Sequence, residues 1–238
     1  MNFYDLHIYG AFSGGESSLE ELASMAKKLG YKGICFTAYY QDRKQMGILQ
    51  AEIERVGKKT GVEIFLGFKA RNTRELGFLA DKRKDFDVLL VRGGNLRLNR
   101  KACETPEVDI LVHPELERSD SGLDHVCLKF AAKNNVAIEV NFREISVSTK
   151  KTRGMILSNI GRNIRLAKKY HTSIIICSGA MSHWELKSPE VMISMACQLG
   201  LELKEAKDGM TKVPEKIIKM IKDRRSGKWV RPGVKVVK

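Results

Sequence analysis

The sequence predicts an α/β protein, a TIM-like barrel of about seven β/α units with an extra C-terminal helix and a basic tail. Seven short, β-branched apolar runs alternate along the 238 residues with longer segments of helical period, the pattern of repeated β/α units. The runs are apolar throughout, as expected of strands covered on both faces of a parallel sheet. An open doubly wound sheet is the alternative, but its dinucleotide-binding form needs GxGxxG after the first strand, where residues 10–15 read GAFSGG.

The strands are expected at seven places along the chain: residues 3–8, 33–37, 62–68, 87–91, 109–112, 136–141 and 173–177. Ser17 and Glu20 form a capping-box pattern before a stripe of leucines and alanines, which predicts the first helix. The second helix is expected to end at Gly61. Asn72 and Glu75 form another capping-box pattern and predict the start of the third helix.

A long helix is expected over residues 153–170, because its isoleucines repeat every four residues. Two later helices are expected over about 188–199 and 214–225, followed by an extended segment that reads GKWVRPGVKVVK. We therefore expect a barrel domain over residues 1–205. Residues 206–238 are expected to form a basic helical extension that packs on the barrel or trails from it.

Positive charge is concentrated in two parts of the chain. The formal net charge is +14 and the sequence pI is about 9.6. Residues 143–170 carry a net charge of +7 and residues 204–238 carry +8, so these two segments hold the whole excess. Such clustering indicates a polyanionic partner, with an ordinary solvated basic surface as the alternative.

Several classes of protein are excluded by composition. No apolar stretch reaches the roughly 20 residues that a membrane-spanning helix needs, so no membrane partner is expected. The first residues, MNFYDLHIYG, contain Asp5 and no basic segment, unlike a signal peptide. The five cysteines form no CxxC pair, which favours buried, reduced thiols. These observations together predict a cytoplasmic protein.

The residues that carry function in a barrel gather where the strands end. The expected strand ends carry two histidines and four cations among the following residues: His7, Thr37, Lys69, Arg71, Arg92, His113, Arg143 and Ser178. We expect no carboxylate there that could act as a general base or hold a metal ion. GxSxG, HExxH and Walker motifs are also absent from the sequence.

The opening FYDLHIYG resembles the start of the polymerase and histidinol phosphatase (PHP) superfamily, whose first strand usually ends in DLHxH. Asp5 and His7 match this pattern, but Tyr9 stands in place of the second histidine. The Gly-x-Glu of the third strand reads GFK and ends in Lys69. His113 precedes a proline, as a ligand histidine of the fifth strand often does, whereas the last strand ends in SGAM and not in SDAH.

This resemblance implies a distorted barrel of seven β/α units and, in the superfamily, two or three metal ions for phosphoester hydrolysis. Lys69 would place an ammonium group where a carboxylate bridges those ions, and a metal cluster needs anionic bridges. We therefore expect His7 and His113 to be relics of a lost metal site, in which Lys69 repels metals and attracts phosphate. A surviving metal-dependent phosphoesterase is the alternative hypothesis.

The segments FTAYY, DVLLVRGGN, DILVHPE, IEVNFREI and IIICSGA, with the opening residues, resemble the ribonuclease P protein component 3 family over roughly residues 1–205. This family is the archaeal counterpart of the thirty-kilodalton subunit of the eukaryotic enzyme. The resemblance implies an accessory protein, not catalytic alone, for the RNA that removes the 5′ leader of precursor tRNA. It implies ribonuclease P RNA, component 2 and other protein subunits as partners, with precursor tRNA contacted indirectly. No cofactor is expected on this chain, while Mg²⁺ is expected for the RNA of the holoenzyme.

The RNA-binding residues are expected among the cations of the strand ends and of two following segments. They are Lys69, Arg71, Arg92, Arg97, Arg100, Arg143, Lys151, Arg153, Arg162 and Arg165. Arginine offers a planar fork that suits phosphate oxygens. Lys151 and Arg153 lie in a Ser/Thr-rich loop that leads into a helix start, and Arg162 and Arg165 share one helical face. A general nucleic-acid-binding barrel without a fixed partner is a further alternative.

Overall fold

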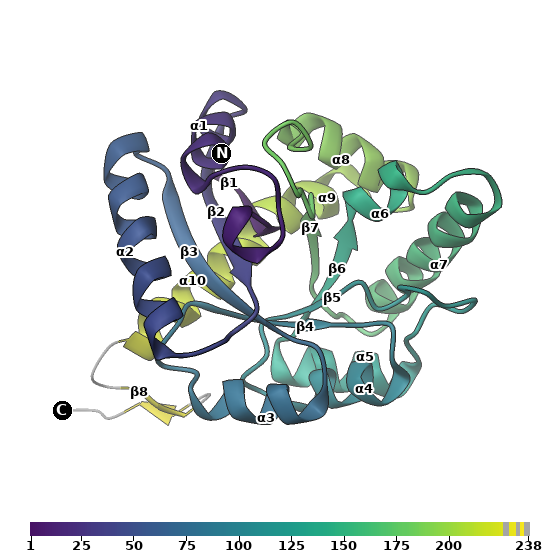
Figure 1. Cartoon of the computed structure of the whole chain (residues 1–238). Helices are drawn as coiled ribbons and strands as arrows, with labels where there is room; N and C mark the ends of the chain where they lie inside the picture. The colour runs from purple at the N-terminus through teal and green to yellow at the C-terminus, as the bar shows by residue number, and fades with distance from the viewer. Residues whose placement is uncertain (226–228, 232–233, 236–238) are drawn as a thin grey trace.

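A computed structural model of the chain describes residues 1–225 in full and the backbone of 229–231 and 234–235 (Figure 1). Seven parallel strands of the described chain form one sheet in sequence order. They are β1 (Phe3–Ile8), β2 (Tyr31–Ala38), β3 (Glu63–Ala70), β4 (Val88–Arg92), β5 (Ile110–Val112), β6 (Ala137–Asn141) and β7 (Ile174–Cys177). The seven predicted strands are therefore confirmed, because each apolar run is buried on both of its faces.

Helices surround this sheet, most of them on its outer face. They are the single-turn η1 (Ala11–Ser13) and α1 (Leu19–Lys28), α2 (Arg43–Thr60), α3 (Thr73–Asp81), α4 (Leu96–Glu104), α5 (His125–Asn134), α6 (Phe142–Val147), α7 (Lys150–Lys169), α8 (Pro189–Gln198), α9 (Leu203–Met210) and α10 (Lys212–Arg225). Figure 1 shows the helices arranged around the strands, as in a TIM-like barrel. The main apolar core lies between the sheet and this helical layer.

The barrel is nearly closed between β1 and β7. The two strands form no regular ladder, but the Tyr9 N–H donates to the Ala180 carbonyl at 2.8 Å. The Gly179 N–H donates to the His7 carbonyl at 3.0 Å. These bonds connect the first and last loops at the carboxyl ends of the strands, so the strand ends surround one common mouth.

Some helix boundaries differ from the prediction. The first capping box uses Ser18 and Glu21, one residue later than expected. The hydroxyl of Ser17 is buried and lies 2.7 Å from Nδ1 of His183. Ser17 therefore makes a tertiary contact and does not cap the helix. Helix α7 begins at Lys150, so Lys151 lies in the first turn of a helix and not in a loop. Helix α9 was not predicted. Gly61 does end α2, in a left-handed conformation.

Helix α10 packs across the amino-terminal end of the barrel. Ile217, Ile218 and Ile221 join a second apolar cluster made of side chains from inside the strands. The Arg224 guanidinium lies 2.7 Å from the buried carboxylate of Asp109, at the expected start of the fifth strand. The extension thus closes the base of the barrel. Its predicted boundary at residue 205 falls inside α9.

Two short strands follow α10. Strand β8 (Trp229–Arg231) pairs antiparallel with β9 (Val234–Lys235). The rest of the predicted extended tail, residues 226–228, 232–233 and 236–238, lies outside the described residues. Within the described part of the chain, no helix has both the length and the apolar composition needed to span a membrane.

Candidate nucleic-acid interface and barrel mouth

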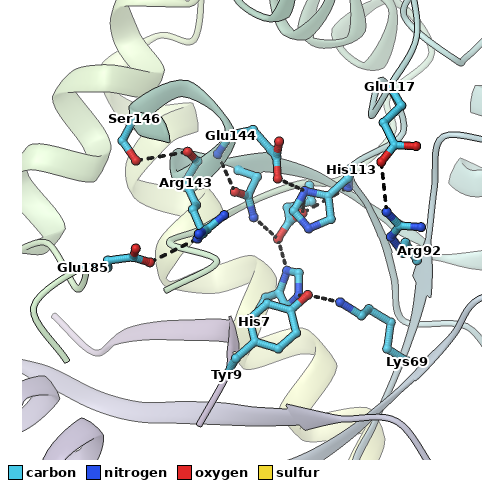
Figure 2. A network of polar contacts seen from close by, with 12 residues as sticks. His7, Tyr9, Lys69, Arg92, His113, Glu117, Arg143, Glu144, Ser146 and Glu185 are labelled. Atoms are coloured by element: carbon cyan, nitrogen blue, oxygen red, sulfur yellow. Dashed lines mark hydrogen bonds and ion pairs between the residues drawn. The ribbon is translucent and has the colours of Figure 1, made fainter. Parts of the chain in front are cut away.

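A chain of polar contacts runs across the floor of the barrel mouth (Figure 2). His7 Nδ1 lies 2.6 Å from Glu139 Oε1, and His7 Nε2 lies 2.8 Å from the Tyr9 hydroxyl. The ammonium group of Lys69 donates a hydrogen bond to that same hydroxyl. With Nδ1–H donating to the carboxylate, a neutral His7 can accept from Tyr9, which accepts from Lys69. Every member of this chain is buried.

Burial sets the ionisation of these groups. It lowers the pKa of Lys69 to about 7 and that of His113 to about 3, because a dry surrounding disfavours the charged form. Burial also lowers the pKa of His7, with Lys69 adding to the effect. It raises the pKa of the Glu139 carboxyl. Lys69 is only 2% exposed, so it forms part of the floor of the mouth and not of the outer surface.

The expectation that no carboxylate reaches this mouth is wrong. Glu139 lies inside β6 and contacts both histidines, accepting the backbone N–H of His113 at 3.1 Å. Glu144, in the first turn of α6, lies 3.6 Å from His113 Nδ1. The last residues of the predicted strands include no carboxylate. Glu139 lies two residues before the end of β6, where strand alternation turns its side chain toward the barrel interior.

The resemblance to the PHP pattern implies a metal site at this mouth, and the residues present there can be compared with it. The ligand atoms of His7, His113 and Glu139 all lie within 4.8 Å of one another. Nδ1 of His113 has no hydrogen-bond partner among the described residues. This set fits one ion at most. It does not fit a centre of several ions bridged by the third strand, because Lys69 is the penultimate residue of β3 and, by the resemblance to the PHP pattern, Tyr9 stands where a second histidine ligand is usual. The absence of a bound metal stays a prediction.

The arginines at the rim of the mouth are paired with carboxylates. Arg71 contacts Glu75 at 2.8 Å and lies over the Tyr39 ring, 4.6 Å from its centroid. Figure 2 shows the two other pairs on opposite sides of His113. Arg92 lies 3.4 Å from Glu117, and Arg143 lies 3.1 Å from Glu185.

Three predicted cations from two helices meet in a groove on the outside of the barrel. Arg97 and Arg100 of α4 and Arg162 of α7 line a pocket of about 560 Å³. Arg100 is paired with Glu104 at 3.1 Å. Arg97 and Arg162 are exposed and form no ion pair with any residue that the structure describes. Two carboxylate residues, Asp120 and Asp124, line the same groove, and Asp120 is paired with Arg118 at 2.7 Å. The groove therefore presents Arg97 and Arg162 outside any ion pair with the described residues.

The loop of residues 113–124 forms the wall between α4 and α7. Asn99 of α4 donates to the carbonyls of Pro114 and Gly122, at 2.9 and 2.8 Å. Asn163 of α7 donates to the carbonyl of Ser121 at 2.9 Å. Both asparagine side chains are buried, so they fix the loop to the two helices. Sequence reasoning missed them, because a buried asparagine has no periodic signal of its own.

Three further predicted residues lie along α7. Lys151, Arg153 and Arg165 are exposed, and Arg153 donates to the backbone carbonyl of Ser148 at 2.8 Å. The N-cap residue Thr149 makes no side-chain cap bond, and the first turn carries no acidic residue. The positive end of the helix dipole is therefore not offset there. Lys151 and Arg162 are separated along the helix by about 16 Å at 1.5 Å per residue.

The ten predicted residues thus fall into three groups. The mouth holds Lys69, Arg71, Arg92 and Arg143; the groove holds Arg97, Arg100 and Arg162; and the exposed face of α7 adds Lys151, Arg153 and Arg165. The mouth group is mostly paired or buried. In the groove group Arg100 is paired with Glu104, whereas Arg97, Arg162 and the three cations of the α7 face have no carboxylate partner in the described chain.

Comparisons with known proteins point to one family. The family model described as RNase P subunit p30 matches residues 2–226. Ribonuclease P protein component 3 of Methanosarcina mazei is 38% identical over 238 residues, 99% of this chain and 95% of the relative. The same component of Methanothermobacter thermautotrophicus is 32% identical and covers 92% of this chain and 89% of its own length.

Solved structures agree on the fold. A chain in the cryo-EM structure of archaeal ribonuclease P with mature tRNA superposes with a TM-score of 0.82 and 27% identity, covering 98% of each chain. A β-aspartyl dipeptidase from Fervidobacterium islandicum superposes with a TM-score of 0.58 at 12% identity, covering 92% of this chain and 72% of its own. The second likeness concerns the barrel alone.

Proposed function

This chain belongs to the RNase P subunit p30 family, and we propose that, as a protein subunit of ribonuclease P, it binds and stabilises the catalytic RNA that removes the 5′ leader of precursor tRNA. One observation supports the RNA-binding role above all others. In the groove between α4 and α7 and on the exposed face of α7, five cations form no ion pair with the described residues: Arg97, Arg162, Lys151, Arg153 and Arg165. Each such cation can neutralise a phosphate and release a counterion.

The recognition we propose is of the RNA backbone and its shape. Arg97 and Arg162 reach one groove from two helices, and Lys151 lies about 16 Å further along α7. Cations spread over such a span suit several phosphates of a folded RNA better than the edge of one base. The buried Asn99 and Asn163 keep this surface rigid.

We further propose that the chain does not cleave RNA alone and binds no cofactor for that reaction. Lys69 occupies the strand end where a bridging carboxylate would hold two metal ions. The Mg²⁺ ions of the reaction then belong to the RNA of the holoenzyme. Component 2 and the other protein subunits are the expected protein partners, precursor tRNA is contacted indirectly, and the cytoplasm is the expected compartment.

A metal-dependent phosphoesterase is the second candidate function. The proximity of His7, His113 and Glu139 favours it, since their ligand atoms lie within 4.8 Å of one another. Metal analysis of the purified chain separates the two functions. Stoichiometric zinc, manganese or iron with a phosphatase activity that His7→Ala abolishes would favour the second candidate over the first.

Reconstitution tests the proposed function directly. Cleavage of precursor tRNA is measured with the RNA and the other protein subunits, with and without this chain, at graded Mg²⁺. A subunit that stabilises the RNA fold should lower the Mg²⁺ concentration needed for half-maximal cleavage. The double variant Arg97→Ala/Arg162→Ala should lose most of that effect, whereas Arg55→Ala, which removes an arginine paired with Glu52 on α2, should keep it. An unchanged Mg²⁺ requirement on adding the wild-type chain contradicts the proposal.

A further inference from the structure

A separate pocket of about 280 Å³ lies in the centre of the barrel mouth. It is not the groove between α4 and α7, and it has none of the same lining residues. Residues at or just after the carboxyl ends of five different strands surround it. They include Tyr39, Lys69, Arg92, His113, Arg143 and Glu144.

Three cations converge on this pocket from different strands. Lys69 comes from β3, Arg92 from the end of β4, and Arg143 from the start of α6. Among the described residues that line the pocket, Glu144 is the only one with a carboxylate.

The ion pairs of the two arginines leave them able to bind a ligand. The Glu117 side chain beside Arg92 is 79% exposed, and the two groups are 3.4 Å apart. Exposed pairs of this kind contribute little and exchange easily. Arg143 contacts Glu185 through Nε, and its two terminal nitrogens donate to no group among the described residues. Each guanidinium can therefore turn donors toward an oxyanion.

The floor of the pocket contains a polar atom that lacks a partner. His113 is 5% exposed, and its Nδ1 forms no hydrogen bond with the described residues. The nearest carboxylate oxygens, of Glu139 and Glu144, are 3.7 and 3.6 Å away, beyond hydrogen-bond distance. A buried polar atom left in this state is costly. A ligand oxygen that reaches the floor would satisfy it.

We propose that this pocket binds one terminal phosphate group, supplied by a phosphate monoester or by inorganic phosphate, with Lys69 and His113 beneath it and Arg92 and Arg143 at the rim. A terminal group fits because buried side chains close the floor, so that an RNA strand cannot pass through. A monoester carries about −1.5 to −2 charges near pH 7. That charge suits three converging cations better than the single charge of a phosphodiester.

Phosphate binding here goes beyond the proposed RNA-binding function and does not depend on the groove. Two sources can supply the group, namely a free nucleotide and the phosphorylated 5′ end of an RNA. Isothermal titration of the full chain with inorganic phosphate, adenosine 5′-monophosphate and adenosine provides the first comparison. Phosphate and the monophosphate should bind and compete with each other, whereas adenosine should not bind.

Variants then locate the site. Arg92→Ala and Arg143→Ala, both at the solvent-facing rim, should each weaken phosphate binding by about tenfold, as expected when one charge-assisted hydrogen bond is removed. Lys69→Met should weaken it further. Arg74→Ala, an exposed arginine at the start of α3, is the matched control and should bind phosphate as the wild type does. Circular dichroism establishes that each variant is folded. Because the rim variants do not change the floor, they keep the test valid if Lys69→Met fails to fold.

The outcomes separate this proposal from the RNA-binding one. Absence of binding at millimolar phosphate, binding unaffected by both rim variants, or stoichiometric Zn²⁺ or Mn²⁺ binding that excludes phosphate would each overturn it. An RNA oligonucleotide with and without a 5′-phosphate identifies the source. If the 5′-phosphate increases RNA affinity and free phosphate abolishes that increase, the pocket binds an RNA end. If the 5′-phosphate does not change RNA affinity, the pocket binds a small molecule. Loss of RNA affinity in Arg97→Ala/Arg162→Ala concerns only the groove.

Discussion

The carboxylate of Asp5 accepts a hydrogen bond from the backbone N–H of Ser178, which lies 3.2 Å from each of its two oxygens. It also accepts the backbone N–H of His7 at 3.3 Å. Asp5 belongs to the first strand and Ser178 follows the last, so this fully buried side chain joins β1 to β7 where the sheet has no regular ladder. The bond therefore helps to bring His7 and the Ser178 loop to the same mouth.

Removal of this carboxylate should destabilise the barrel. Asp5→Ala leaves the buried Ser178 N–H without an acceptor, at a cost of about 1–3 kcal/mol in the free energy of unfolding. Urea denaturation measures the change. Asp81→Ala, at an exposed position at the end of α3, is the control and should stay within about 0.5 kcal/mol of the wild type. Equal stabilities of the two variants would show that Asp5 does not hold the seam.

The contribution of two buried carboxyl groups to stability should fall as the pH rises from about 4 to 8. Burial raises the pKa of Asp5 to about 7 and that of Glu115 to about 8. A folded-state pKa above the unfolded value means that folding favours the protonated carboxyl. This contribution is complete below the unfolded pKa and is lost as the pH rises through the folded one. Free energies of unfolding at pH 5 and pH 8 should therefore differ more for the wild type than for Asp5→Asn, and parallel profiles would disprove the assignment.

The salt dependence of RNA binding should report the groove cations. The slope of log affinity against log salt should become shallower by about one for each phosphate that the protein no longer neutralises, so Arg97→Ala and Arg162→Ala should each reduce it. Filter binding to the catalytic RNA between low and moderate salt gives the slope. Arg55→Ala serves as the control, because that arginine is already paired on α2. A slope that none of these changes alters would place the RNA elsewhere.

Gly122 should tolerate no side chain. Its φ is +70°, and a Cβ there would overlap the Pro114 carbonyl oxygen and crowd the Asn99 amide. Gly122→Ala should therefore lower the free energy of unfolding by about 1–3 kcal/mol, as expected for backbone strain of this type, and weaken RNA binding by moving the wall of the groove. Gly77→Ala is the opposite control, since α3 leaves its Cβ in open space. That change should stabilise the chain by about 0.5–1 kcal/mol.

Helix α10 should depend on its buried ion pair. The Asp109 carboxylate contacts both Arg83 and Arg224 and accepts the Leu89 N–H at 2.8 Å. Arg224→Ala removes one of the two cations from a buried carboxylate that keeps Arg83, and should cost about 1–3 kcal/mol. Thermal unfolding followed by circular dichroism measures the loss. Lys222→Ala, two residues away and exposed, should have little effect, and a similar loss in both variants would mean that general helix content explains the result.

The barrel could be predicted from the sequence because its signals are local. An apolar strand such as residues 88–91 is recognisable without its neighbours, and Gly61 ends α2 through its own conformational freedom. The predicted cap at Ser17 failed for the opposite reason. A side chain 166 residues away, His183, engages that hydroxyl, and no local pattern contains that information.

The same contrast holds for the candidate sites. The residue types of the PHP pattern and the excess of cations were visible in the sequence, including Lys69 in place of a carboxylate. The burial and the ion pairing of these side chains were not visible in the sequence, because both arise from contacts between distant segments. Folding hides Lys69, pairs Arg92 with Glu117, and brings Glu139 between two histidines from other strands.

The sequence by itself therefore determined the seven β/α units, the lysine near the end of the third strand and the basic character of the chain. Only the tertiary structure decided which cations are exposed and unpaired, and so which face of the molecule is suited to phosphates. The physical reason is that periodicity and residue type act over a few neighbouring residues. Desolvation and ion pairing depend on which segments meet in space, as Arg97 and Arg162 do across the groove between α4 and α7.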